Sequence, residues 1–227
     1  MLYDYAKVLA VSKKLDEAIK VVDSAKKMKY FANSKRDFSL LEGQLWAECC
    51  NYEKAIFCCN ECISLEDTNG FDGEARFMLM NLYLIQSDYK AALEQSTEIV
   101  KRDMGDSYYY AALYYKPFCM KQLGNVEESR KVYREANSIY RLATLNNPAA
   151  IDIYLYRAMC LKDMEEFDKA MEMLDFIVKL NDQIAEVHVI RSDIYRIQGH
   201  KSLSNEEMQK AYKLKPSLNP DQESVGC

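Results

Sequence analysis

The chain has 227 residues, of which 49% are hydrophobic and 29% are charged, and its net charge at neutral pH is −5. This composition is too apolar for a disordered protein, and 7 glycines with 4 prolines are too few for the turns of an all-β fold. Acidic and basic residues alternate without a contiguous basic stripe, so nucleic acid is not expected as a partner.

The N-terminal stretch "MLYDYAKVLAVSKKLDE" lacks the basic segment and pure apolar core of a secretion signal. No apolar run approaches the roughly 18 residues that a membrane span requires. Eight cysteines in such a chain indicate free thiols in a reducing compartment. The sequence therefore predicts a cytoplasmic protein without a membrane partner.

Five segments repeat one pattern along the chain, in which a large apolar residue and two polar residues precede a small residue. In chain order they are "LDEAI" at Leu15, "YEKAI" at Tyr52, "YKAAL" at Tyr89, "VEESR" at Val126 and "FDKAM" at Phe167. The small residues are Ala18, Ala55, Ala92, Ser129 and Ala170, spaced 37, 37, 37 and 41 apart, with Ser204 a weaker sixth 34 further on. A fixed period of this length predicts a stacked repeat architecture.

Each small residue has packing residues at constant distances on both sides. Seven positions later stand Ala25, Cys62, Ile99, Ala136, Ile177 and Ala211, and nine positions earlier stand Leu9, Trp46, Tyr83, Met120, Leu161 and Tyr195. A spacing of seven returns to the same helical face, whereas the nine-residue gap crosses a polar turn such as "QSDY". The unit is helix, turn, helix, and its small residues let two helices approach to about 8 to 10 Å. We predict an all-α fold, an α-solenoid of stacked helical hairpins.

Local signals refine the helix boundaries. Asn147 followed by Pro148 predicts an N-cap and first helical position, and "SNEE" from Ser204 to Glu207 is typical of a capping box. The four extra residues in the 41-residue spacing predict a second helix longer by one turn, in "EESRKVYREANSIYRLATL". Pro117 lies inside a predicted helix, where we expect a kink that adjusts the curvature of the superhelix; the alternative is that it opens the groove beside Tyr114.

The repeat resembles the tetratricopeptide repeat (TPR) family over nearly the whole chain, from about Leu2 to Pro216. The triads Trp46, Ala55 and Cys62, then Tyr83, Ala92 and Ile99, then Leu161, Ala170 and Ile177 fall at the family's signature positions. The first-helix small residue is kept as Ala6, Gly43, Ala158 and Ser192 but is replaced by Met80 and Pro117 in the third and fourth units. The resemblance implies a right-handed superhelix of five to six hairpins over residues 1–216, followed by a flexible polar tail over 217–227.

The family's first helices line a concave groove that binds peptides, and the resemblance transfers this role to matching positions. The implied peptide-binding residues are Leu40, Gln44, Phe77, Asn81, Tyr110, Tyr114, Phe118, Leu155 and Met159, with Lys121, Lys162 and Arg196 as a basic row for an acidic group of the ligand. Within "YYYAALYY", Tyr110, Tyr114 and Phe118 share one stripe on the groove, while Tyr108, Leu113 and Tyr115 are expected to pack between hairpins.

Three other functions fit the sequence less well. "CNEC" at Cys59 and Cys62 has metal-ligand spacing, but both positions are core positions in neighbouring units and no second C-x-x-C pair exists. Only His188 and His200 are present, no catalytic motif occurs, and Asp163 is expected in a solvated turn, so we predict no enzyme activity and no cofactor. The chaperone-peptide mode of the family is disfavoured because only Asn81 matches its carboxylate-binding set.

The sequence thus predicts a non-enzymatic protein-interaction module or scaffold that binds a peptide or partner helix. The alternative is a structural, self-assembling solenoid, or a regulatory segment of a larger chaperone or enzyme. Leu2, Tyr5, Val8 and Leu9 of the first hairpin are expected to present apolar surface, which would allow a homodimer through a terminal hairpin or through the groove.

Overall fold

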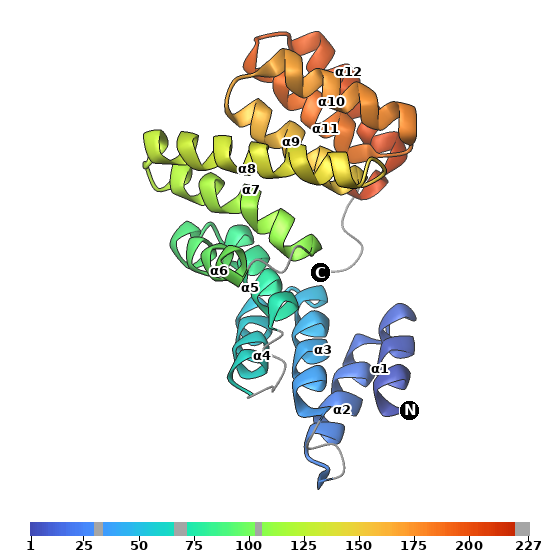
Figure 1. The fold of residues 1–227 in the computed structure, drawn as a ribbon. Helices are drawn as coiled ribbons and strands as arrows, with labels where there is room; N and C mark the ends of the chain where they lie inside the picture. The colour runs from blue at the N-terminus through green and yellow to red at the C-terminus, as the bar shows by residue number, and fades with distance from the viewer. Residues whose placement is uncertain (30–33, 66–71, 103–105, 221–227) are drawn as a thin grey trace. The chain divides into compact units, whose positions relative to one another are not determined.

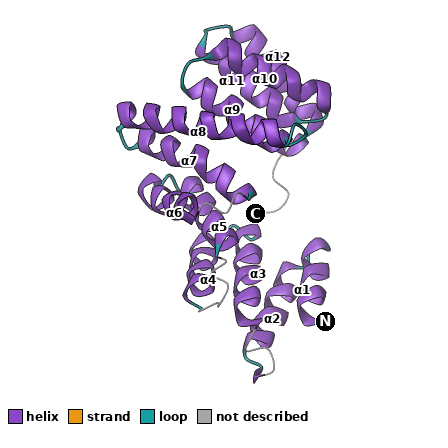
Figure 2. Ribbon diagram, in the orientation of Figure 1, coloured by secondary structure: helices purple, strands orange, loops and turns teal. Residues whose placement is uncertain are grey.

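The computed structural model describes residues 1–29, 34–65, 72–102 and 106–220 (Figure 1). Figure 2 shows helices and connecting loops, with no strand in these ranges. The helices are α1 (Leu2–Val11), α2 (Leu15–Lys26), α3 (Lys35–Glu48), α4 (Tyr52–Ser64), α5 (Gly73–Ile85), α6 (Tyr89–Arg102), α7 (Ser107–Gln122), α8 (Val126–Asn146), α9 (Ile151–Asp163), α10 (Phe167–Leu180), α11 (Ala185–Ile197) and α12 (Lys201–Leu214). A short 3-10 helix, η2 (Pro216–Leu218), packs on α12. The predicted all-α class is confirmed.

The chain forms two compact units, the first containing α1 to α6 and the second α7 to α12 with η2. Each unit contains three hairpins, because α1 packs on α2, α3 on α4, and so on to α11 on α12. In both units each hairpin also packs on the next, through pairs such as α2 with α3 and α8 with α9. The helices Leu2 to Leu214 lie within the range 1–216 expected for the solenoid, and residues 221–227 of the expected tail lie outside the described ranges.

The small residues of the repeat lie at the helix crossings, as predicted. Ala18, Ala55, Ala92, Ser129, Ala170 and Ser204 are all buried, and so are the six residues seven positions later. In the last hairpin the Oγ atoms of Ser192 and Ser204 lie 2.9 Å apart and share a hydrogen bond in the core. A larger side chain at these positions would separate the two helices of the hairpin.

The turns within the six hairpins share one backbone geometry that the sequence analysis did not identify. Each contains one residue in the left-handed region, five positions before the small residue: Lys13, Cys50, Ser87, Gly124, Glu165 and Gly199. In the third turn the Asp88 amide donates to the Tyr83 carbonyl at 2.8 Å and the Ser87 amide to the Leu84 carbonyl at 3.0 Å, and the other five turns repeat this pair of bonds. These are Schellman motifs, which satisfy the last carbonyls of the first helix.

The second helix of the fourth hairpin is lengthened by more than the predicted single turn, since α8 has 21 residues where α10 and α12 have 14 each, a difference of about two turns. This extension corrects the prediction for Asn147. Because α8 runs to Asn146, Asn147 ends that helix instead of capping the next one, and α9 begins only at Ile151. Helix α7 continues through Pro117, which is buried.

The predicted capping box at Ser204 is also wrong. Helix α12 already begins at Lys201, so Ser204 lies in its second turn. Glu207, predicted as the carboxylate of the box, instead lies 2.6 Å from His188 Nδ1 and accepts from Lys210 Nζ at 2.6 Å. Burial raises the pKa of Glu207, but these two hydrogen bonds outweigh that effect and leave the pKa below its ordinary value.

Among the described residues six cysteines have free thiols, whereas Cys50 is disulfide-bonded, which corrects the expectation of a free thiol at that position. Cys58, Cys59 and Cys62 are buried in the first unit, with Cys59 in a cluster with Ala55, Leu79 and Leu82. Burial raises the pKa of both Cys58 and Cys59 to about 12, which keeps these thiols protonated and unreactive. No helix in the described part of the chain is long and apolar enough to cross a membrane.

Candidate functional site

The first helices of the three hairpins in the second unit, α7, α9 and α11, lie side by side. Together with η2 they enclose a cavity of about 320 Å³, called here the α7–α9–α11 pocket. It is lined by Tyr115, Asp152, Leu155, Tyr156, Met159, Glu186, Val189, Ile190 and Leu218. Leu155 and Met159 were predicted as ligand contacts, and the structure brings them together on this pocket. A mainly apolar cavity with a few charged groups at its edge is the usual form of a site for one apolar side chain.

Tyr114 and Tyr115 exchange the roles that the sequence assigned to them. Tyr114 is only 3% exposed, so its ring is unavailable to a ligand, whereas Tyr115 lines the pocket. The predicted groove position of Tyr114 is therefore corrected to a core position. Neighbouring residues on a helix point about 100° apart, so the face of α7 that lines the pocket differs by one residue from the face that the repeat frame assigned.

A partly buried carboxylate holds Tyr114 in place. The Tyr114 hydroxyl donates to Asp163 Oδ2 at 2.8 Å, and the Tyr133 hydroxyl donates to the same oxygen at 3.2 Å. Asp163 is the last residue of α9 and its side chain is 13% exposed, which corrects the prediction of a solvated turn residue. Burial and then the Asp163 charge raise the pKa of the Tyr114 hydroxyl well above its ordinary value, so it remains a donor.

Aromatic residues of α7, α8 and α9 form a continuous ring cluster around Tyr114. Its ring centroid lies 6.0 Å from that of Phe118 and 6.4 Å from that of Tyr156. The half-buried Tyr110 packs on Tyr140 at 6.2 Å, and its carbonyl accepts the Tyr140 hydroxyl at 2.6 Å. The cluster reaches the pocket wall through Tyr156, so it forms a rigid support beneath the pocket.

The three cations of the predicted basic row pair with two carboxylates within the protein. Lys121 pairs with Asp163 at 3.4 Å, and Lys162 pairs with Asp193 at 3.4 Å. Arg196 also pairs with Asp193, and none of these cations lines the pocket. None of the three therefore supplies charge at this pocket, and their contact with an acidic group of a ligand stays a prediction.

The charged groups that do line the pocket are acidic. Asp152 and Glu186 stand at its edge, one on α9 and the other on α11. Asp152 has no ion-pair partner among the described residues, whereas Glu186 pairs with Lys215 at 3.0 Å. The hydrogen bond from Lys215 keeps the pKa of Glu186 below its ordinary value, so this carboxylate is ionised at neutral pH. The pocket thus favours an apolar group with a basic group beside it.

The chain itself supplies such a pair of groups. Directly after α12, Lys215 reaches Glu186 and Leu218 lines the pocket. The turn between them is held by hydrogen bonds from the Leu218 amide to the Lys215 carbonyl and from the Asn219 amide to the Pro216 carbonyl, both 3.0 Å long. The segment Lys215–Pro216–Ser217–Leu218 therefore places a cation and an aliphatic side chain at the two kinds of surface that the pocket offers.

The other predicted site residues lie in the first unit. Leu40 and Gln44 are on α3, and Phe77 and Asn81 are on α5, and all four are partly buried. Gln44 donates from Nε2 to Glu74 Oε1 at 3.0 Å, so part of its hydrogen-bonding capacity is already used. None of the four lines the α7–α9–α11 pocket.

Several residues of the pocket were missed by the sequence analysis: Tyr115, Asp152, Tyr156, Glu186, Ile190 and Leu218. A signal for two of them was present. Asp152 and Glu186 each stand six positions before the first-helix small residue of their hairpin, Ala158 and Ser192, so the repeat frame places two carboxylates in one row. No signal pointed to Leu218, which lies after the last repeat. In the part of the chain that the structure describes, no group of His, Cys, Asp and Glu side chains is arranged to hold a metal ion.

Comparison with solved structures shows the TPR fold. The structure is similar to a thermophilic TPR protein of Thermus thermophilus, with a TM-score of 0.64 and 21% identity over 80% of this chain and 92% of the other. It is also similar to a tetratricopeptide repeat protein of Parabacteroides merdae, with a TM-score of 0.65 and 19% identity over 94% of this chain and 77% of the other. No protein-family model and no curated protein matches the sequence.

Proposed function

We propose that the chain is a non-enzymatic protein-interaction module whose α7–α9–α11 pocket binds a peptide segment of a partner protein. The ligand has an aliphatic side chain that enters the pocket and a basic side chain that pairs with Asp152 or Glu186. The observation that carries this proposal is the position of the chain's own Leu218 and Lys215 on the same surfaces.

Shape and chemistry both support one aliphatic anchor. Leu155, Met159 and Val189 provide walls from two helices, and a cavity of about 320 Å³ is at the lower end of the range for small ligand sites. A side chain buried here gains about 1.5 to 3 kcal/mol from leaving water. The pair at the rim adds less, since the Lys215 and Glu186 side chains are each 51% exposed.

The proposal predicts that a random peptide library selected on the full chain will enrich an aliphatic residue near a lysine or arginine. Replacing Leu155 and Met159 together by alanine should weaken the selected peptide at least about tenfold, which corresponds to about 1.4 kcal/mol. Fluorescence polarisation with the labelled peptide measures this loss. The matched control is Leu203→Ala on α12, whose side chain is 42% exposed and does not line the pocket.

The α7–α9–α11 pocket is the wrong site if the double variant is folded by circular dichroism and still binds with full affinity. If the library yields no enriched sequence, the proposal that the chain binds peptides is itself contradicted. In that case a self-associating solenoid becomes the better interpretation.

A second prediction concerns the chain's own C-terminal turn, which lines the pocket and which we expect to compete with a ligand for it. Replacing Lys215 and Leu218 by alanine should tighten binding of the selected peptide several-fold, because apparent affinity is reduced by the fraction of molecules in which the pocket is closed. Polarisation titrations of the two proteins compare the dissociation constants directly. Weaker binding by the variant would show instead that Leu218 forms part of the wall that the ligand needs.

One observation favours the alternative, self-association through the first hairpin. On α1, Tyr5 is 52% exposed and Val8 is 61% exposed. Leu9, expected on the same surface, is buried, and Leu2 packs against the core of the first unit. The apolar surface is therefore smaller than predicted, and light scattering of the purified chain distinguishes a monomer from a dimer.

A further inference from the structure

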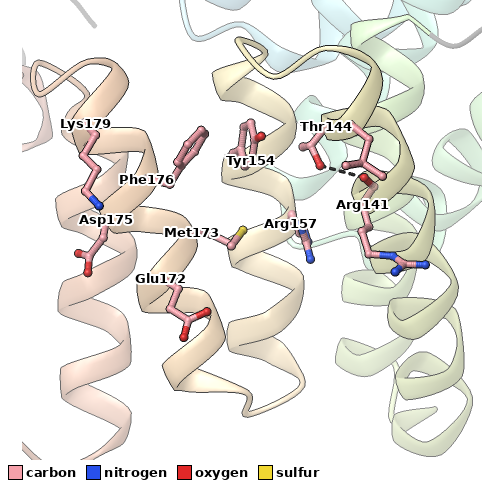
Figure 3. Close-up of a pocket in the computed structure, with 10 residues that line it drawn as sticks. Arg141, Thr144, Tyr154, Arg157, Glu172, Met173, Asp175, Phe176 and Lys179 are labelled. Atoms are coloured by element: carbon pink, nitrogen blue, oxygen red, sulfur yellow. Dashed lines mark hydrogen bonds between the residues drawn. The ribbon is translucent and has the colours of Figure 1, made fainter.

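A second cavity of about 480 Å³ lies between α8, α9 and α10 on the other side of α9, and is called here the α8–α9–α10 pocket (Figure 3). Its lining residues are Arg141, Thr144, Leu145, Tyr154, Arg157, Glu172, Met173, Asp175, Phe176 and Lys179. Thr144 and Leu145 belong to the last turn of α8, so the helical extension that breaks the regular spacing of the repeat builds one wall of the pocket.

The floor of the pocket is apolar. Tyr154 and Phe176 have ring centroids 4.8 Å apart, and Met173 lies beside them (Figure 3). Tyr154 is 9% exposed and is part of the second-unit core, which fixes the position of its ring. A flat apolar side chain of a ligand could be covered by these groups.

Two arginines stand on one side of this floor without a carboxylate partner among the described residues. In Figure 3 the Arg141 and Arg157 guanidinium groups point in the same direction. Arg157 Nε donates to Asn137 Oδ1 at 3.2 Å, which orients the group and leaves its terminal nitrogens for other partners. Burial, and then the nearby Arg141 charge, hold the pKa of Arg157 below its ordinary value.

The charges around the pocket leave a net positive potential. Asp175 is already paired with Arg191, so Glu172 is the lining carboxylate that opposes Arg141, Arg157 and Lys179. Two neighbouring guanidinium groups repel one another, and a carboxylate between them would accept from both. The complementary ligand group is an anion next to an apolar side chain.

We propose that the α8–α9–α10 pocket binds an acidic segment of a partner protein. One Asp or Glu of that segment lies between Arg141 and Arg157, and an adjacent aromatic or aliphatic residue covers Tyr154, Phe176 and Met173. Nucleic acid is a poorer occupant, since three cations beside Glu172 on a chain of net charge −5 cannot follow a phosphate backbone.

This site is independent of the α7–α9–α11 pocket. Leu155 and Met159 lie on one face of α9, whereas Tyr154 and Arg157 lie on the opposite side of the same helix. The two pockets also differ in charge, because carboxylates border one and arginines border the other. The second unit can therefore hold a basic segment and an acidic segment at the same time.

The test is a selection on the full chain with a peptide library that has Asp or Glu at alternate positions and random residues between them. We expect enrichment of an aromatic or aliphatic residue beside an acid. The Arg141→Gln/Arg157→Gln double variant should bind the selected, labelled peptide at least about tenfold more weakly. Arg134→Gln on the exposed side of α8 is the matched control and should stay within about twofold of the parent chain.

Two further variants distinguish binding at this pocket from a loss of folding and from binding at the α7–α9–α11 pocket. Glu172→Gln removes the opposing carboxylate and should tighten binding several-fold, and this change does not depend on the stability of the arginine variant. The Leu155→Ala/Met159→Ala variant should bind the acidic peptide unchanged, so failure of one site does not imply failure of the other.

The proposal is overturned if the acidic library gives no enrichment, or if the arginine variant binds the selected peptide as well as the parent chain does. Binding to single-stranded DNA or to phosphatidylserine vesicles that is lost in the arginine variant, with no peptide selected, would equally count against a protein ligand.

Discussion

A Tyr114→Ala variant should have a free energy of unfolding lower by about 3 to 5 kcal/mol, the usual cost of truncating a large buried aromatic residue. The ring is 3% exposed and contacts the rings of Phe118, Tyr133 and Tyr156. Its removal leaves a cavity in the middle of the aromatic cluster. It also removes the shorter of the two tyrosine hydrogen bonds to the partly buried carboxylate of Asp163. Urea unfolding followed by circular dichroism measures the change.

The Tyr114→Phe variant separates packing from hydrogen bonding. It keeps the ring and loses only the bond to Asp163, so we expect a smaller loss of about 1.5 to 3 kcal/mol, typical of a hydrogen bond to a charged group. Tyr5→Ala, at a ring that is 52% exposed, should change stability by no more than about 0.5 kcal/mol. A Tyr114→Ala variant with unchanged stability and abolished peptide binding would restore the sequence-based prediction that this ring contacts a ligand.

The comparison of Tyr114 with Tyr115 shows where sequence reasoning loses accuracy. The constant spacing of small residues predicts the hairpins, because a close helix crossing tolerates few residue types and so marks its position in the sequence. The direction of a side chain between the crossing points depends on rotations smaller than the angle between neighbouring residues. Hence Leu155 and Met159, which the repeat frame assigned to the groove, line the pocket, while on α7 the core position is Tyr114 and the pocket position is Tyr115.

The ion pairs of the three cations could not be predicted from the sequence for a different reason. Lys121 and Asp163 are 42 residues apart, and Lys162 and Asp193 are 31 apart, on successive first helices. The repeat frame placed the three cations in one row but gave no distance to carboxylates on the next hairpin. The left-handed backbone conformation of turn residues such as Lys13 and Ser87 was also not predictable from the sequence. Glycine is the usual signal for that conformation, and it occupies only two of the six described hairpin turns.

The strongest test of the repeat geometry is at Gly43, where α3 crosses α4. A Cβ atom at this position would lie 3.3 Å from Cys59 Sγ, 3.4 Å from the Ala55 carbonyl oxygen and 3.4 Å from Cys58 Cβ. Leucine adds three more carbon atoms for which this crossing has no space. We expect Gly43→Leu to lower the free energy of unfolding by about 3 kcal/mol or more, at or above the upper end of the usual cost of overpacking.

Gly43→Ala is the matched control, and its effect should be small. Alanine gains roughly 1 kcal/mol of helix propensity over glycine, while the neighbouring thiol side chain must move by a few tenths of an ångström. The two effects oppose one another, so the urea midpoint of Gly43→Ala should lie close to that of the parent chain. If Gly43→Leu were as stable as Gly43→Ala, the helices of this hairpin could separate at little cost. In that case the small residues of the other hairpins would not be required for the close approach of their helices, contrary to what their regular spacing indicates.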